Sequence, residues 1–126
     1  MKSKLQRKKD NPRSTYWRNK ADKAWGEWMH RTYSCCAVCG RTDGKLDAHH
    51  LISRSCASTR HDKRNGIMLC ANHHRLSAVR SPHKGPIGFV NWLMKHKPDV
   101  YKWVTENKWK VSKPDYKAAY EKLTEV

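Results

Sequence analysis

The chain has 126 residues, which fits one compact domain with extra segments at its ends better than two full domains. Only 37% of the residues are hydrophobic and 30% are charged, so a large apolar core is excluded and a metal or a partner is expected to support folding. The 27 Lys and Arg residues outnumber the 11 Asp and Glu residues, and the resulting charge of +16 favours an anionic partner, nucleic acid first.

Two further classes are disfavoured by the pattern of apolar residues. No stretch approaches the roughly 18 apolar residues of a membrane span, and no apolar segment follows the basic N-terminus as it would in a secretory signal. The five cysteines are an odd number whose spacing suits metal better than disulfides. We therefore expect a reducing cytoplasm as the location.

The N-terminal part divides into a basic segment and a helical pattern. Residues 1–20 carry eight basic side chains against Asp10 alone, which predicts a flexible basic arm, or else a disordered tail without a role. From Asn19 to Tyr33 apolar residues recur at helical spacing, and we expect Trp25, Trp28 and Met29 to pack inward.

The rest of the chain predicts short strands followed by helices. Residues 45–52 and 66–69 are candidate strands, and residues 71–79 have a helical pattern. Amphipathic helices are expected over 87–96, from Pro98, and from Pro114 and Asp115. The predicted class is α+β, with an arm (1–20), a central unit (21–84) and a helical C-terminal extension (85–126).

Two pairs of potential metal ligands frame the central unit. Cys36 and Cys39 are separated by two residues, as are Cys70 and His73. Two such pairs complete a tetrahedral zinc site, and the glycine after Cys39 is typical of a zinc knuckle. Cys35 could replace Cys36, although the two-residue gap argues against it, and Cys56 has no assigned role.

Further metal-binding and polar residues lie between and beside these pairs. They are Asp47, His49, His50, Asn65 and His74. Adjacent residues on a helix point about 100° apart, so His73 and His74 should not bind the same ion. We expect His74 to have a separate purpose, with His49 and His50 as its partners.

The order of these elements resembles the HNH endonuclease motif in its zinc-containing form, over residues 36–75. The three elements are Cys36-x2-Cys39, Asp47-Ala-His49-His50-Leu-Ile, and Asn65-Gly-Ile-Met-Leu-Cys70-x2-His73-His74. The resemblance implies a ββα-metal fold, with His50 on the first strand, Asn65 in the connecting loop and His74 on the helix.

The same resemblance implies a mechanism of phosphodiester hydrolysis in DNA. His50 would be the general base, Asn65 would fix the loop, and His49 and His74 would bind one divalent cation (Mg²⁺, Mn²⁺ or Ni²⁺). Successive residues on a strand face opposite sides. Either the strand ends or bends at His49 and His50, or Asp47 is an alternative ligand.

The basic residues near the motif are candidate phosphate contacts, namely Arg54, Arg60, Lys63, Arg64 and Arg75. No base-reading element is evident, so low sequence specificity is expected.

A small HNH protein with a basic arm is similar to phage-encoded nucleases acting in the host cytoplasm. Its helical tail is loosely similar to NinG/Rap recombination nucleases, which would favour branched DNA. The alternative is a non-catalytic zinc module that binds DNA. A homodimer or a phage protein partner is left open.

Overall fold

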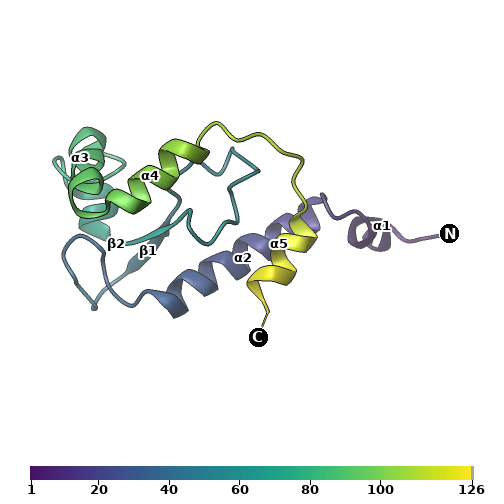
Figure 1. Cartoon of the computed structure of the whole chain (residues 1–126). Helices are drawn as coiled ribbons and strands as arrows, with labels where there is room; N and C mark the ends of the chain where they lie inside the picture. The colour runs from purple at the N-terminus through teal and green to yellow at the C-terminus, as the bar shows by residue number, and fades with distance from the viewer. Residues whose placement is uncertain (126) are drawn as a thin grey trace.

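The computed structural model describes residues 1–125 as a mixed α+β fold (Figure 1). Helix α2 (Thr15–Thr32) runs beneath a two-stranded sheet, and α1 (Lys4–Asp10) lies at the N-terminal end of α2, away from that sheet. Among residues 1–125, none of the helices combines the length and the apolar composition that crossing a bilayer requires.

The N-terminal segment, expected as a basic arm, contains helix α1. Ser3 caps α1 by accepting a hydrogen bond from the Gln6 amide, and Lys2 pairs with Asp10 at 2.7 Å. The bond to Ser3 satisfies a backbone amide that the helix end leaves open. Helix α1 buries no residue, and α2 begins at Thr15, four residues before the start expected from apolar spacing.

Strands β1 (Leu46–His49) and β2 (Ile67–Cys70) pair antiparallel, with His49 opposite Ile67 and Asp47 opposite Leu69. Because side chains alternate along a strand, the two faces of the sheet carry different residues. Ile67 and Leu69 belong to a core with Phe89, Trp92 and Leu93, whereas Met68 packs with Trp25 and Met29 of α2. Asp47 and His49 therefore share the first of these faces.

After β2 the chain makes one turn of π-helix, η1 (Asn72–Leu76), where an α-helix was expected over 71–79. The Ser77 amide donates to the Asn72 carbonyl at 2.7 Å, which closes the wider turn. π-Helical turns are rare and often occur at functional sites. The ββα order implied by the resemblance is present, with η1 as its short helix.

The C-terminal helices are α3 (Pro86–His96), α4 (Pro98–Asn107) and α5 (Tyr116–Leu123). Pro98 begins α4 and Asp115 caps α5, as the sequence predicts, whereas α3 begins at Pro86, one residue before the expected start. Helix α5 returns to lie along α2, where Leu123 joins Trp25 and Met29 in the second core (Figure 1). The segment after residue 85 thus contributes to both cores.

Candidate metal centres and active site

Four side chains with sulfur and nitrogen donors meet beside the sheet. The Sγ of Cys70 lies 3.3 Å from Nδ1 of His73, Cys36 Sγ lies 3.8 Å from the same nitrogen, and Cys39 Sγ lies 3.8 Å from Cys70 Sγ. All four donor atoms fall within 4.8 Å of one another. Three thiolates and one imidazole are a donor set that zinc accepts. This cluster, the Cys/His site, could bind zinc.

The backbone turn at Cys36–Gly40 makes this gathering possible. Gly40 has a φ of +75°, a conformation that residues with a Cβ rarely adopt, and its amide donates to the Cys36 carbonyl at 2.8 Å. The Ala37 amide donates to Met68 in β2 at 2.9 Å, which ties the turn to the sheet. Burial acts to raise the pKa of Cys36, but backbone hydrogen bonds outweigh it and lower that pKa overall.

A second cluster is formed by three imidazoles on the other side of the π-helical turn. Nε2 of His74 lies 3.2 Å from Nδ1 of His49 and 3.1 Å from Nε2 of His83. The three donor atoms lie within 4.8 Å of one another, and we call this cluster the three-His site. His74 is buried, while His83 is exposed and comes from the loop before α3.

His83 was missed by the sequence analysis because it falls outside the recognised motif. Its backbone position nevertheless has a structural cause. Gly85 and Gly88 allow the start of α3 to approach residues 78–79 so closely that an added Cβ would collide with backbone there. This close packing fixes the position of the loop that carries His83. A lone histidine before a Gly-Pro pair was the only signal in the sequence.

Asp47 does not belong to the three donor atoms of this site. Its Oδ2 instead accepts a hydrogen bond from Nδ1 of His74 at 3.1 Å. A proton on Nδ1 leaves Nε2 of a neutral His74 free as a donor atom for a metal. The geometry thus favours His49 as the ligand, with Asp47 orienting its partner.

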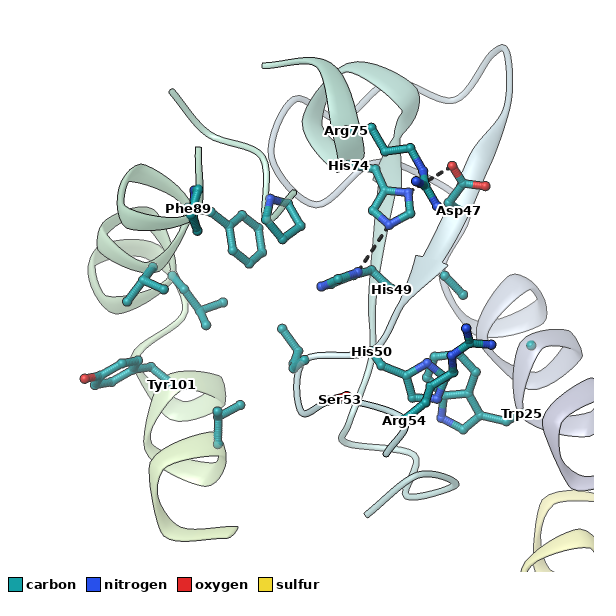
Figure 2. Close-up of a pocket in the computed structure, with 18 of the residues that line it drawn as sticks. Trp25, Asp47, His49, His50, Ser53, Arg54, His74, Arg75, Phe89 and Tyr101 are labelled. Atoms are coloured by element: carbon teal, nitrogen blue, oxygen red, sulfur yellow. Dashed lines mark hydrogen bonds and ion pairs between the residues drawn. The ribbon is translucent and has the colours of Figure 1, made fainter. Parts of the chain in front are cut away.

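The strand ends at His49, so His50 is just beyond β1 and not on it as the resemblance implied. Because successive side chains of an extended chain face opposite sides, the rings of His49 and His50 still point in different directions. Figure 2 shows His49 directed at His74, whereas His50 lies on the α2 side, next to Trp25. The Trp25 and His50 rings stack at 3.8 Å between centroids with 13° between their planes.

His50 is held by one backbone hydrogen bond. Its Nε2 donates to the Arg60 carbonyl at 2.9 Å. A carbonyl can only accept, so Nε2 carries the proton and Nδ1 of the neutral ring carries a lone pair. Burial lowers the pKa of His50 to about 4 and that of His49 to about 3, so both rings are neutral at physiological pH.

Asn65 anchors the loop between the strands and is completely buried. Its Nδ2 donates to the carbonyls of Ile52 and Thr59, both at 3.0 Å, and its Oδ1 accepts from the Ile52 amide at 2.6 Å. One side chain therefore joins the two ends of the segment 52–59. Since residue 60 follows directly, Asn65 helps to position the carbonyl that holds His50.

His49 and His50 line one cavity of about 840 Å³. Its polar wall includes Asp47, His49, His50 and His74, and its apolar wall comes from α3 and α4 (Figure 2). Of the candidate phosphate contacts, Arg54 and Arg75 also line the cavity. The others are engaged elsewhere: Arg60 pairs with Asp22, Arg64 with Asp62, and Lys63 lies 5.2 Å from the Trp28 ring centroid.

Comparison with known proteins gives a match to one family over part of this region. Residues 36–78 match the model of a family described as HNH endonuclease. No curated protein and no solved structure matches the chain. The resemblance to this nuclease family is thereby confirmed over the matched segment. That segment holds all four residues of the Cys/His site and, of the three-His site, His49 and His74.

Proposed function

We propose that the protein is a metal-dependent endonuclease that hydrolyses phosphodiester bonds in DNA. The observation that carries this proposal is the arrangement of His50. Its Nε2 is committed to the Arg60 carbonyl, its Nδ1 is left as a base, and the ring lines the same cavity as His49 and His74. HNH nuclease domains act on DNA, and the charge of +16 fits that substrate.

In this proposal the proton of the attacking water moves to Nδ1 of His50. Because its pKa is lowered to about 4, His50 is neutral at physiological pH and its Nδ1 lone pair can accept this proton. Trp25 limits rotation of the ring by stacking on it, and the Arg60 carbonyl stabilises the proton on Nε2 once Nδ1 is protonated. Asn65 supports that carbonyl from the neighbouring residue.

The divalent cation of the reaction would be held by His49, His74 and His83. When bound, it would neutralise charge on the phosphate and stabilise the leaving oxygen. Three imidazoles suit Mn²⁺, Ni²⁺ or Zn²⁺ better than Mg²⁺, which prefers oxygen ligands. The third histidine therefore disfavours Mg²⁺, an ion that a site with only two histidines would still allow. Zinc at the Cys/His site would have a structural role.

Substrate contacts would come from Arg54 and Arg75, whose side chains line the cavity. Contacts to phosphates position a protein on DNA without reading its sequence, so cleavage of low sequence specificity is expected. A phage origin, action in the host cytoplasm and a preference for branched DNA stay predictions from the sequence alone.

The test is nicking of supercoiled plasmid with Mn²⁺, Ni²⁺ or Mg²⁺, against EDTA. We expect activity with Mn²⁺ or Ni²⁺ that exceeds activity with Mg²⁺. His50→Ala should lower the rate by roughly 100-fold or more, because a general base contributes at least that much. The exposed His96 provides the matched control, since His96→Ala should keep the wild-type rate.

Two results would contradict the proposal. Full activity of His50→Ala would exclude His50 as the general base. Binding of DNA without cleavage in the presence of any of these ions would favour the non-catalytic zinc module. A panel of linear, nicked, single-stranded and four-way junction DNA of equal length tests the branched substrate. Equal rates on the junction and the linear duplex would exclude that preference.

A further inference from the structure

A charged cluster joins α2 to the loop between the strands, outside both metal sites. Asp22 of α2 accepts two parallel hydrogen bonds from Arg60, from Nε and from Nη2, each at 2.8 Å. It also accepts a third from Nε2 of His61 at 2.6 Å. Two-pronged bonds of this kind between a carboxylate and a guanidinium restrict orientation as well as distance.

The two donors of the cluster are largely shielded from solvent, whereas the side chain of Asp22 is 32% exposed. The side chains of His61 and Arg60 are 4% and 15% exposed. Burial acts to raise the pKa of Asp22, but the hydrogen bonds and charges of Arg60 and His61 outweigh it and lower that pKa overall. Asp22 is therefore ionised and occupied on both oxygens at neutral pH.

The backbone between these two side chains contains the carbonyl that binds His50. Residue 59 is held on one side, where its carbonyl accepts from Asn65 at 3.0 Å. Residues 60 and 61 are held on the other side by Asp22. The Arg60 carbonyl, 2.9 Å from Nε2 of His50, lies between the two attachments. Movement of this peptide would release the proton-bearing nitrogen of the ring.

We propose that Asp22 is a positioning residue: by binding Arg60 and His61, it holds the Arg60 carbonyl that keeps His50 in its Nε2-protonated tautomer. Asp22 acts through the loop and does not take the proton itself. Its catalytic consequence rests on the proposed function of His50, whereas its effect on the tautomer does not.

The primary variant is Asp22→Asn, which keeps the shape of the side chain but removes its charge and one acceptor. The loop carries a matched control. Asp62 accepts a two-pronged pair from Arg64, with distances of 3.0 and 2.9 Å, and a third hydrogen bond from the Arg64 amide at 2.9 Å. Asp62→Asn therefore breaks an equivalent pair without disturbing the carbonyl that binds His50.

The first readout is nitrogen NMR of the His50 ring in ¹⁵N-labelled, zinc-loaded full-length protein at neutral pH. In the wild type we expect Nε2 to have the shift of a protonated nitrogen and Nδ1 that of an unprotonated one. Asp22→Asn should move both shifts toward their average, because the two tautomers then interconvert. Asp62→Asn should leave them unchanged.

The second readout separates kcat from KM in plasmid nicking. We expect Asp22→Asn to lower kcat by roughly tenfold, within the range that general-base catalysis contributes, while KM and Mn²⁺ affinity stay within about twofold. Arg60→Lys, which cannot form the two-pronged pair, should change the tautomer and kcat in the same direction. It provides the same test should Asp22→Asn fail to fold.

Wild-type ring shifts in a folded Asp22→Asn or Arg60→Lys protein would overturn the inference. So would a loss of kcat matched by Asp62→Asn, since the effect would then reflect general loosening of the loop. A changed tautomer with unchanged kcat would contradict the catalytic consequence alone. Failure of the proposed function is recognised separately, by full activity of His50→Ala.

Discussion

Asp47 is not one of the three donors of the three-His site, but its carboxylate hydrogen-bonds to His74, which is. Its position opposite Leu69 puts it on the same sheet face as His49, and its Oδ2 reaches Nδ1 of His74 at 3.1 Å. Such a partner fixes the ring and makes the other nitrogen more basic toward a metal. The spacing Asp47-Ala48-His49 is equally compatible with a direct ligand, and only the position of His74 distinguishes the two roles.

At this scale we predict that Asp47→Asn weakens Mn²⁺ binding to the three-His site by roughly 10–100-fold, the usual effect of removing such a partner. Cleavage at saturating Mn²⁺ should recover most of the wild-type rate, because the ligands remain. Calorimetric titration of zinc-loaded protein measures the affinity. Asp43→Asn, at an exposed carboxylate paired with Arg41, is the control. Unchanged Mn²⁺ affinity in Asp47→Asn would contradict this role.

At the scale of the element, helix α3 shows why a glycine inside a helix can be required. A Cβ at Gly88 would overlap the carbonyl oxygen of Val79, whereas a Cβ at Gly26 in α2 would meet nothing within 4 Å. Both glycines lie in helices, where glycine is normally unfavourable relative to alanine. Their local environments therefore predict opposite signs for the same substitution.

We predict that Gly88→Ala lowers the free energy of unfolding by about 1–3 kcal/mol, the usual cost of overpacking. Gly26→Ala should raise it by about 0.5–1 kcal/mol, because it removes the entropy cost of glycine in a helix. Urea unfolding of the two variants measures both values. Since the loop before α3 carries His83, Gly88→Ala should also weaken Mn²⁺ binding. Equal stabilities of the two variants would show that α3 can move without cost.

At the scale of the whole molecule, the Cys/His site connects the turn at Cys36–Gly40 to β2 and η1. Cys36 and Cys70 are buried in the same core as Phe89 and Trp92. This core is small for the chain, in agreement with the low share of hydrophobic residues. Binding of a structural zinc contributes about 10–16 kcal/mol to folding in small zinc domains, which equals or exceeds the usual net stability of a domain.

We therefore predict that Cys70→Ser, or removal of zinc by a strong chelator, abolishes cooperative thermal unfolding of the region built on the sheet. Circular dichroism melts together with zinc content by mass spectrometry provide the measurement. Cys35→Ser is the matched control, because Cys35 is not among the four clustered ligands and should keep zinc and stability. Loss of zinc in Cys35→Ser would instead favour Cys35 as the ligand. A well-folded, zinc-free Cys70→Ser protein would refute the structural role.

The helices and strands were predictable where local chemistry decides them. Pro98 and Asp115 mark helix starts in the sequence and in the structure. The boundary at α2 and the π-helical turn of η1 were not predictable. Both depend on interactions beyond the local apolar spacing, namely the contacts of Trp17 with Lys9 and Tyr120 and the packing of the segment that carries His73 and His74.

The sequence by itself determined the two ligand pairs, which follow from residue types at short spacing, and its resemblance to the HNH motif implied His50 as a base. Only the tertiary structure decided that His83 lies beside His49 and His74, that Asp47 accepts a hydrogen bond from His74, and that Asp22 pairs with Arg60. These contacts join residues 9 to 38 positions apart. Spacing along the chain cannot reveal them, because the packing of α2, β1 and the loop before α3 sets their distances.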